Sequence, residues 1–405
     1  MGSYPEARDR APVADVYDAH AMSRTRKRLA LIAAPVLLAG ATYALAQDYF
    51  EAAAFVARAA GMQGLARHAA ALEADAVAES PVSVPWRGGR VRGRSYLPSD
   101  VTSNPVLVLP GVHAAGIDEP RLINFAREIA ATGHPVTTAE LPDLVRYQIT
   151  PRSTDIIEDA AAWLGREWDD RLPADQRRVG LMGISFAGGL AIVAASRMGD
   201  RVAWIVSLGG HGDLPRTLRY LCTGQEPDGS TRPPHDYGVV IILLGVAERL
   251  VPPDQVEPLR QAIRSFLQAS HVDMIDKEQG AAQFAKTRDL TQHLPEPART
   301  YMTWVNDRNV AQLGPVLLPH VSALGGNPAL SPERNSPPRG AVFLLHGLDD
   351  NVIPASESVV LARKLREAGA QVEQLATPLI THAEVDRSPG LGEIWRLVRF
   401  WAAPL

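Results

Sequence analysis

The chain has 405 residues, of which 46% are hydrophobic and 21% are charged, and its formal net charge is -4. This length favours one large domain with an appendage or an insertion over a single small core. The slightly acidic balance offers no basic footprint for a polyanion, so we predict no nucleic-acid partner.

An apolar run near the N-terminus predicts a membrane-spanning segment. Leu29–Ala46 carries no charge and follows four basic residues between Arg24 and Arg28. As a helix it would rise about 27 Å, close to the ~30 Å hydrocarbon core of a bilayer.

Because basic residues stay in the cytoplasm, we expect residues 1–28 to be a disordered cytoplasmic tail. We then expect a single-pass membrane protein whose catalytic domain lies outside the cytoplasm. Two alternatives stay open: a secretory signal cleaved near Ala46, and a helix docked on the soluble domain. Residues 47–80 are rich in alanine and predict an amphipathic helical linker.

From residue 81 the hydrophobic pattern predicts a domain that runs to residue 405. Val82–Trp86 and Val91–Tyr96 alternate around a Gly-Gly turn, which is typical of a β-hairpin. Short apolar strands then alternate with helical patterns, beginning with Val106–Leu109. This rhythm predicts an α/β fold with a mostly parallel sheet covered by helices on both faces.

The alternation stops over residues 213–338, where the patterns are mostly helical, as in Val256–Ala269 and Val310–Leu324. Strands return at Ala341–Leu345 and Gln371–Thr377, and a final helix is expected over Leu391–Trp401. We interpret 213–338 as a helical cap inserted into the sheet domain. Its larger apolar residues either roof the site or pack against the sheet domain, and include Leu243, Leu244, Leu259, Ile263, Phe266 and Leu267.

The motif Gly183-Ile184-Ser185-Phe186-Ala187 lies between the strand Arg178–Met182 and the helix Phe186–Arg197. This is the strand–turn–helix context of a nucleophile elbow, in which small residues flank an exposed serine. The serine would lie at a helix N-terminus, whose partial positive charge favours a developing oxyanion. We predict that Ser185 is a catalytic nucleophile, although a serine N-cap in a tight turn has the same pattern.

A catalytic acid is expected in the loop after the strand Ala341–Leu345. Asp350 lies three residues after Gly347, and a carboxylate there can accept the N–H of a catalytic imidazole. Asp213, after the strand Trp204–Leu208, is a competing acid. His346 is interpreted as a structural residue that binds loop backbone.

His382 follows the last predicted strand and is the expected catalytic base. The chain order Ser, Asp, His is that of one common class of serine hydrolase. The backbone N–H groups of Phe186 and Val112 are the expected oxyanion hole, since Gly111 allows close approach of the loop after Val106–Leu109. His113 would line the acyl pocket or bind a loop.

Residues from about 82 to 405 resemble the α/β-hydrolase superfamily. The elbow, the Gly347-Leu-Asp-Asp-Asn-Val-Ile-Pro354 segment and the late histidine carry this resemblance. Within it, the Pro-Gly-Val-His loop and the Gly-x-Ser-Phe-Ala-Gly-Gly elbow are similar to bacterial esterase, dienelactone-hydrolase-like or serine-aminopeptidase-like proteins. The resemblance implies an eight-stranded, mostly parallel sheet, no metal, and two-step acyl transfer.

The sequence contains no phosphate-binding glycine loop, dinucleotide fingerprint or paired metal-ligand motif, so we predict no cofactor and no metal. We expect a serine hydrolase that cleaves a carboxylic ester, or a related acyl bond, of a small molecule through an acyl-enzyme. An acyltransferase on the same fold and a non-catalytic binding protein are the alternatives. The pattern gives neither the natural substrate nor the oligomeric state.

Overall fold

A computed structural model describes residues 46–60, 74–380 and 390–405. The chain divides into two compact units, Met1–Phe50 and Glu51–Leu405. All the labelled helices and strands belong to the second unit.

The second unit is built on a sheet that, in the described residues, has eight strands in the order β1-β2-β4-β3-β5-β6-β7-β8. β2 pairs antiparallel with both β1 and β4, whereas the remaining neighbours are parallel. The predicted α/β class with a mostly parallel sheet is therefore confirmed. The strands are β1 (Val77–Trp86), β2 (Gly89–Pro98), β3 (Val106–Leu109), β4 (Val136–Ala139), β5 (Val179–Ile184), β6 (Val202–Leu208), β7 (Ala341–Gly347) and β8 (Val372–Thr377).

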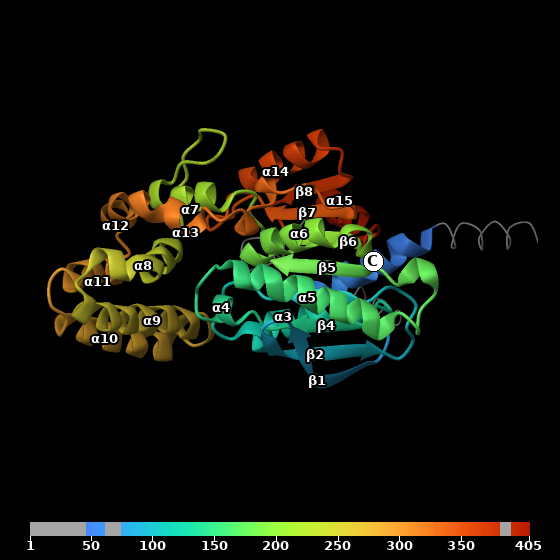
Figure 1. Cartoon of the computed structure of the whole chain (residues 1–405), viewed down its shortest axis with the longest axis horizontal. Helices are drawn as coiled ribbons and strands as arrows, with labels where there is room; N and C mark the ends of the chain where they lie inside the picture. The colour runs from blue at the N-terminus through green and yellow to red at the C-terminus, as the bar shows by residue number, and fades with distance from the viewer. Residues whose placement is uncertain (1–45, 61–73, 381–389) are drawn as a thin grey trace, which may run out of the picture. The chain divides into compact units, whose positions relative to one another are not determined.

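Helices cover both faces of this sheet (Figure 1). Alternate residues of β3 enter different cores: Leu107 and Leu109 join the helices on one face, and Val106 and Val108 join those on the other. Since both faces are buried, strands such as β3 are continuously apolar. The helices of the sheet domain are α3 (Pro120–Ala130), α4 (Pro142–Val145), α5 (Pro151–Trp168), α6 (Phe186–Met198), α14 (Ala355–Glu367) and α15 (Leu391–Trp401).

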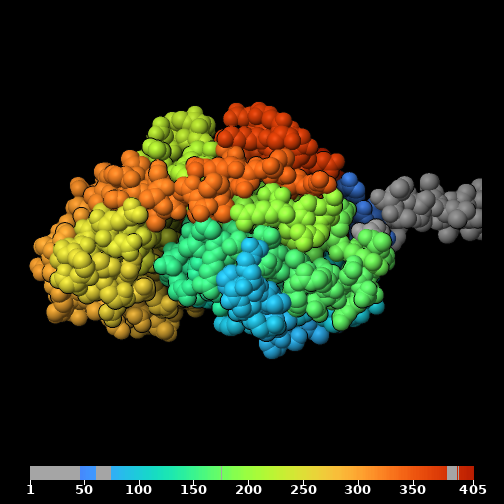
Figure 2. Space-filling view, viewed as in Figure 1, coloured from blue at the N-terminus to red at the C-terminus, as the bar shows by residue number. Residues whose placement is uncertain are grey.

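Between β6 and β7 the chain leaves the sheet and forms a series of helices, which Figure 2 shows as a continuous yellow-to-orange body. Helix α9 begins and ends beyond the predicted Val256–Ala269. The predicted helix Val310–Leu324 is broken at Pro319, because proline lacks the N–H that continues a helix. The inserted helices are α7 (Leu214–Thr223), α8 (Asp236–Leu250), α9 (Pro253–Ile275), α10 (Lys277–Gln292), α11 (Ala298–Asn306), α12 (Val310–Leu317) and α13 (Val321–Gly325).

Part of the predicted linker packs on the sheet domain. Residues 51–59 are helical, and the buried Phe55 lies edge-on to Trp401 with ring centroids 4.9 Å apart. Phe125 of α3 completes the cluster at 6.1 Å from Phe55. Such aromatic contacts bury large apolar areas, so this stretch contributes to the core that contains Val106 and Val108.

The predicted single-pass membrane location, with an extracytoplasmic catalytic domain, is contradicted. Among the described residues, no helix has both the length and the apolar character needed to cross a bilayer. Residues 29–45 of the predicted segment Leu29–Ala46, and the tail 1–28, lie outside the described residues.

Candidate active site

The turn after β5 holds Ser185 in an unusual backbone conformation. Its φ is 55° and its ψ is -132°, and L-residues rarely adopt such a positive φ. The backbone N–H of Ser185 donates to the carbonyl of Leu208 at 2.7 Å, and its own carbonyl accepts from Gly188 at 2.8 Å. Bonds on both sides keep the residue in this conformation at the start of α6.

Two glycines provide the space that this turn requires. A Cβ on Gly183 would lie 2.4 Å from the carbonyl oxygen of Ala187, which is backbone and cannot move aside. A Cβ on Gly111 would lie 3.2 Å from the Ser185 Cβ. The loop after β3 therefore passes directly beside the serine, because β3 and β5 are neighbours with Leu109 opposite Gly183.

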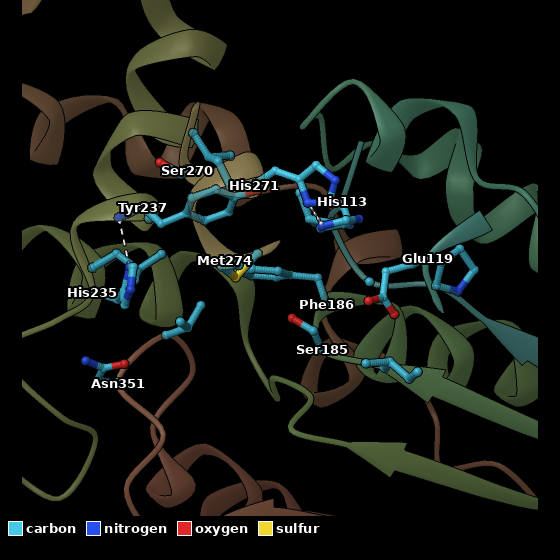
Figure 3. Close-up of a pocket in the computed structure, with 18 of the residues that line it drawn as sticks. His113, Glu119, Ser185, Phe186, His235, Tyr237, Ser270, His271, Met274 and Asn351 are labelled. Carbon is cyan, nitrogen blue, oxygen red and sulfur yellow. Dashed lines mark hydrogen bonds between the residues drawn. The ribbon is translucent and has the colours of Figure 1, made fainter. Parts of the chain in front are cut away.

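Ser185 opens into a pocket of about 450 Å³ between the sheet domain and the inserted helices (Figure 3). The predicted oxyanion-hole residues Val112 and Phe186 both line this pocket. In Figure 1 the arrow of β5 points toward the inserted helices, and the carboxyl ends of parallel strands meet at one edge. Open α/β sheets bind ligands at this edge.

Apolar side chains from both parts of the domain form much of the pocket wall. None of the six apolar residues of the insertion listed from the sequence lines this pocket; Leu259, Ile263 and Phe266, for example, are almost fully buried elsewhere. They pack among the inserted helices, since α9 contacts α8, α10 and α11, whereas the simpler of the two interpretations was packing against the sheet domain. The apolar lining residues include Pro110, Val112, Leu122, Ile149, Ile184, Phe186, Leu218, Leu221, Ile241, Met274 and Val352.

Asp350 lies after β7 and is only 1% exposed. Its Oδ1 accepts the backbone N–H groups of Val352 and Ile353, both at 2.9 Å. These two bonds fix the carboxylate in a tight loop. The neighbouring loop residues Asn351 and Val352 line the pocket.

The other acidic and histidine candidates near these strands have structural partners. Asp213 caps α7 by accepting the backbone N–H of Arg216 at 3.0 Å, and it pairs with Arg334 at 2.6 Å. His346 Nε2 lies 2.7 Å from the carbonyl oxygen of Ile353 and 3.4 Å from Asp350 Oδ2. A carbonyl only accepts, so Nε2 carries a hydrogen, and His346 supports the loop of Asp350 as expected.

The expected base, His382, lies outside the described residues, which end at Ile380 and resume at Gly390. Strand β8 precedes it in the chain and pairs with β7, with Thr377 opposite Gly347. The end of β8 therefore lies beside the strand that precedes Asp350.

The pocket also contains polar residues that the motif analysis missed. Figure 3 shows Glu119, Tyr237, Ser270 and His271 around the same cavity as Ser185. Three of the four come from inserted helices, for which the sequence offers no catalytic motif.

Two of these four residues, Glu119 and Tyr237, have shifted pKa values. Burial would raise the pKa of Glu119, but hydrogen bonds from Arg121 and the backbone of Leu122 outweigh it and lower the pKa. Burial raises the pKa of Tyr237 well above its ordinary value. The first group is therefore charged and the second neutral at physiological pH. Within the described residues, no set of three or more His, Cys, Asp or Glu side chains is arranged to hold a metal ion.

The strand order and the serine turn together define the α/β-hydrolase fold. The chain has this fold, as the resemblance in its motifs implied.

The sequence matches no protein-family model and no curated protein. Among solved structures, it is similar to an esterase of Pyrobaculum calidifontis at 14% identity and a TM-score of 0.43, over 82% of this chain and 86% of that one. A thermostable carboxylesterase cloned from a metagenomic library gives 13% and 0.44, over 82% and 90%. The acylaminoacyl peptidase of Pyrococcus horikoshii gives 13% and 0.44, over 80% of this chain but only 40% of that one. At these sequence identities and TM-scores, the similarity carries no conclusion about a reaction or a substrate.

Proposed function

We propose that this protein is a serine hydrolase that cleaves a carboxylic ester through an acyl-enzyme. The observation that carries the proposal is the strained turn at Ser185, which directs the residue into a pocket shared with Val112 and Phe186. A serine with φ of 55° costs backbone energy, and such strain is concentrated at functional sites. A plain helix cap would need neither the strain nor the pocket.

In the proposed mechanism, His382 takes the Ser185 proton as the serine oxygen attacks the acyl carbonyl. Asp350 holds the imidazole and stabilises its charged form. The N–H groups of Val112 and Phe186 bind the oxyanion of the tetrahedral intermediate. The alcohol leaves with the proton from His382, and water then releases the acid by the same steps in reverse order.

The lining of the pocket supports an uncharged, largely apolar acyl or alcohol group. Leu218, Leu221 and Ile241 of the inserted helices face the same cavity as Ser185. We propose that the insertion acts as a cap that shields the bound substrate from bulk solvent and selects substrates by shape. An ester is favoured over an amide because its leaving alkoxide needs less assistance.

A fluorophosphonate probe tests the proposal with little assumption about the substrate. We expect the probe to label the folded protein on Ser185, identified by mass spectrometry of the modified peptide. Ser185→Ala should lose both the labelling and the hydrolysis of p-nitrophenyl esters, while its unfolding temperature stays close to that of the wild type. A matched variant is Ser196→Ala, whose hydroxyl binds the carbonyl of Val193 in α6, and it should keep both.

Absence of labelling in folded protein would favour the non-catalytic alternative. Labelling without ester hydrolysis in water, but with ester formation when alcohols are added, would favour the acyltransferase. Wild-type hydrolysis by Ser185→Ala would overturn the assignment of the nucleophile.

A further inference from the structure

Two histidines from distant parts of the chain meet beside the pocket. His113 directly follows Val112 on the loop after β3, and His271 lies near the end of α9 in the insertion. Their Nε2 and Nδ1 atoms are 3.0 Å apart, and the rings are nearly perpendicular with centroids 4.5 Å apart (Figure 3). This hydrogen bond joins the loop of the proposed oxyanion hole to the cap.

The surrounding bonds decide where the hydrogens lie. The backbone N–H of Ala115 donates to His113 Nδ1 at 3.2 Å, so this nitrogen carries no hydrogen. The neutral His113 ring therefore has its hydrogen on Nε2 and donates it to His271 Nδ1. His271 must then be an acceptor at Nδ1, and a side chain without an acceptor there breaks the connection.

The charge state of His113 also favours a lasting bond. Burial, followed by the neighbouring His271, lowers the pKa of His113 to about 4, with Arg121 acting in the same direction and Glu119 opposing it. His113 consequently stays neutral across the pH range in which a serine hydrolase works. Helix α9 also places the carboxylate of Asp273 at the pocket, and this carboxylate is paired with Lys277 at 2.7 Å.

We propose that His271 is a positioning residue that holds the Val112 loop for oxyanion binding through its hydrogen bond to His113. The inference rests on the proposed function, since it concerns the same site. Oxyanion stabilisation depends on N–H groups placed before the reaction starts, so a loop that moves by a fraction of an ångström loses rate rather than substrate affinity. The cap would thereby contribute to catalysis as well as to specificity.

Other contacts besides this hydrogen bond hold the insertion against the sheet domain. Helix α8 places Tyr237 against Tyr147 of the sheet domain, with ring centroids 6.1 Å apart, and α9 packs against α8. Removing one partly buried imidazole should therefore leave the insertion folded.

The test compares two replacements of the same side chain. His271→Leu keeps the bulk but removes the acceptor, and we expect kcat for a p-nitrophenyl ester to fall about tenfold with KM changed less than twofold. His271→Asn places an amide oxygen near the position of Nδ1 and should keep most of the rate. The matched control is His293→Leu, since His293 is exposed and binds only the carbonyl of Asp289 on its own helix.

A boronic acid gives a second readout that a purely structural role would not change. Its tetrahedral adduct uses the oxyanion hole, so its affinity for His271→Leu should fall by the same factor as kcat. If His271→Leu is unfolded at the assay temperature, His271→Gln replaces it. The amide of this glutamine would lie near the position of Nε2, so it would not replace the acceptor at Nδ1. The proposal then requires the Asn variant to be active and the Gln variant to be slow.

Equal kcat in the wild type and in His271→Leu, or equal loss in the Asn and Leu variants, would overturn the inference. These outcomes differ from failure of the proposed function, in which Ser185→Ala would keep the activity of the wild type.

Discussion

The guanidinium of Arg216 makes two hydrogen bonds to the fully buried carboxylate of Glu357, at 2.7 and 2.8 Å. Arg216 lies at the start of the insertion, whereas Glu357 lies in α14 of the sheet domain. Arg216 also donates to Glu333 at 3.0 Å, near the end of the insertion. One side chain thus ties both ends of the insertion to the sheet domain.

The first prediction concerns this ion pair. Glu357→Ala should lower the free energy of unfolding by roughly 3 to 5 kcal/mol, because it leaves a largely buried guanidinium short of its partner. The Gly212 N–H, which donates to Glu357 at 2.9 Å, also loses its acceptor. Chemical denaturation measures the loss.

The matched control for Glu357→Ala is an exposed pair. Asp200 and Arg339 lie 2.7 Å apart with side chains 76% and 70% exposed. Asp200→Ala should change the free energy by less than about 1 kcal/mol. Equal losses in the two variants would contradict the role of burial.

The second prediction concerns acid pH. Burial would raise the pKa of Glu333, but Arg216 and Lys364 outweigh it, so the pKa lies below its ordinary 4.5. Because the unfolded chain takes up this proton at higher pH than the folded one, stability is full above about pH 4.5 and is lost as the pH falls through the lower folded pKa. Glu333→Gln should be less stable at pH 7 and should lose less stability on acidification. Denaturant titrations at several pH values measure the slope, and an unchanged slope would count against the charge network.

The third prediction concerns the serine turn. Gly183→Ala should destabilise the protein or displace Ser185, because the added Cβ meets backbone at 2.4 Å. We expect loss of fluorophosphonate labelling together with a lower unfolding temperature. Gly392→Ala is the comparison, since its Cβ would lie in open space in α15, and it should be neutral or stabilising by up to about 1 kcal/mol. Normal labelling of Gly183→Ala would show that the turn tolerates a side chain.

The fourth prediction concerns the proposed acid. Asp350→Asn should keep the fold, because an amide oxygen can still accept from Val352 and Ile353. It should nevertheless lower kcat on the order of 10⁴-fold, since an amide cannot stabilise a charged imidazole. Asp349→Asn is the neighbouring control, with a side chain 80% exposed, and its effect should stay below about tenfold. Similar rates for Asp350→Asn and the wild type would remove Asp350 from the mechanism.

Much of the sheet domain was predictable because its signals are local. The run Val106–Leu109 is apolar at every position, and the structure forms β3 over these same residues. The turn at Ser185 was also predictable, since small residues at fixed spacing are a steric requirement of that turn. The break at Pro319 was missed because the apolar pattern continues on both sides of it.

The sequence by itself determined the class of fold, the serine turn and the order of the proposed catalytic residues, because each depends on residues near one another in the chain. Only the tertiary structure decided which side chains surround Ser185. His113 and His271 are 158 residues apart, and their contact follows from how α9 packs rather than from any motif. Likewise, Leu259 and Leu221 look alike in the sequence, but packing buries the first inside the insertion and turns the second toward the pocket.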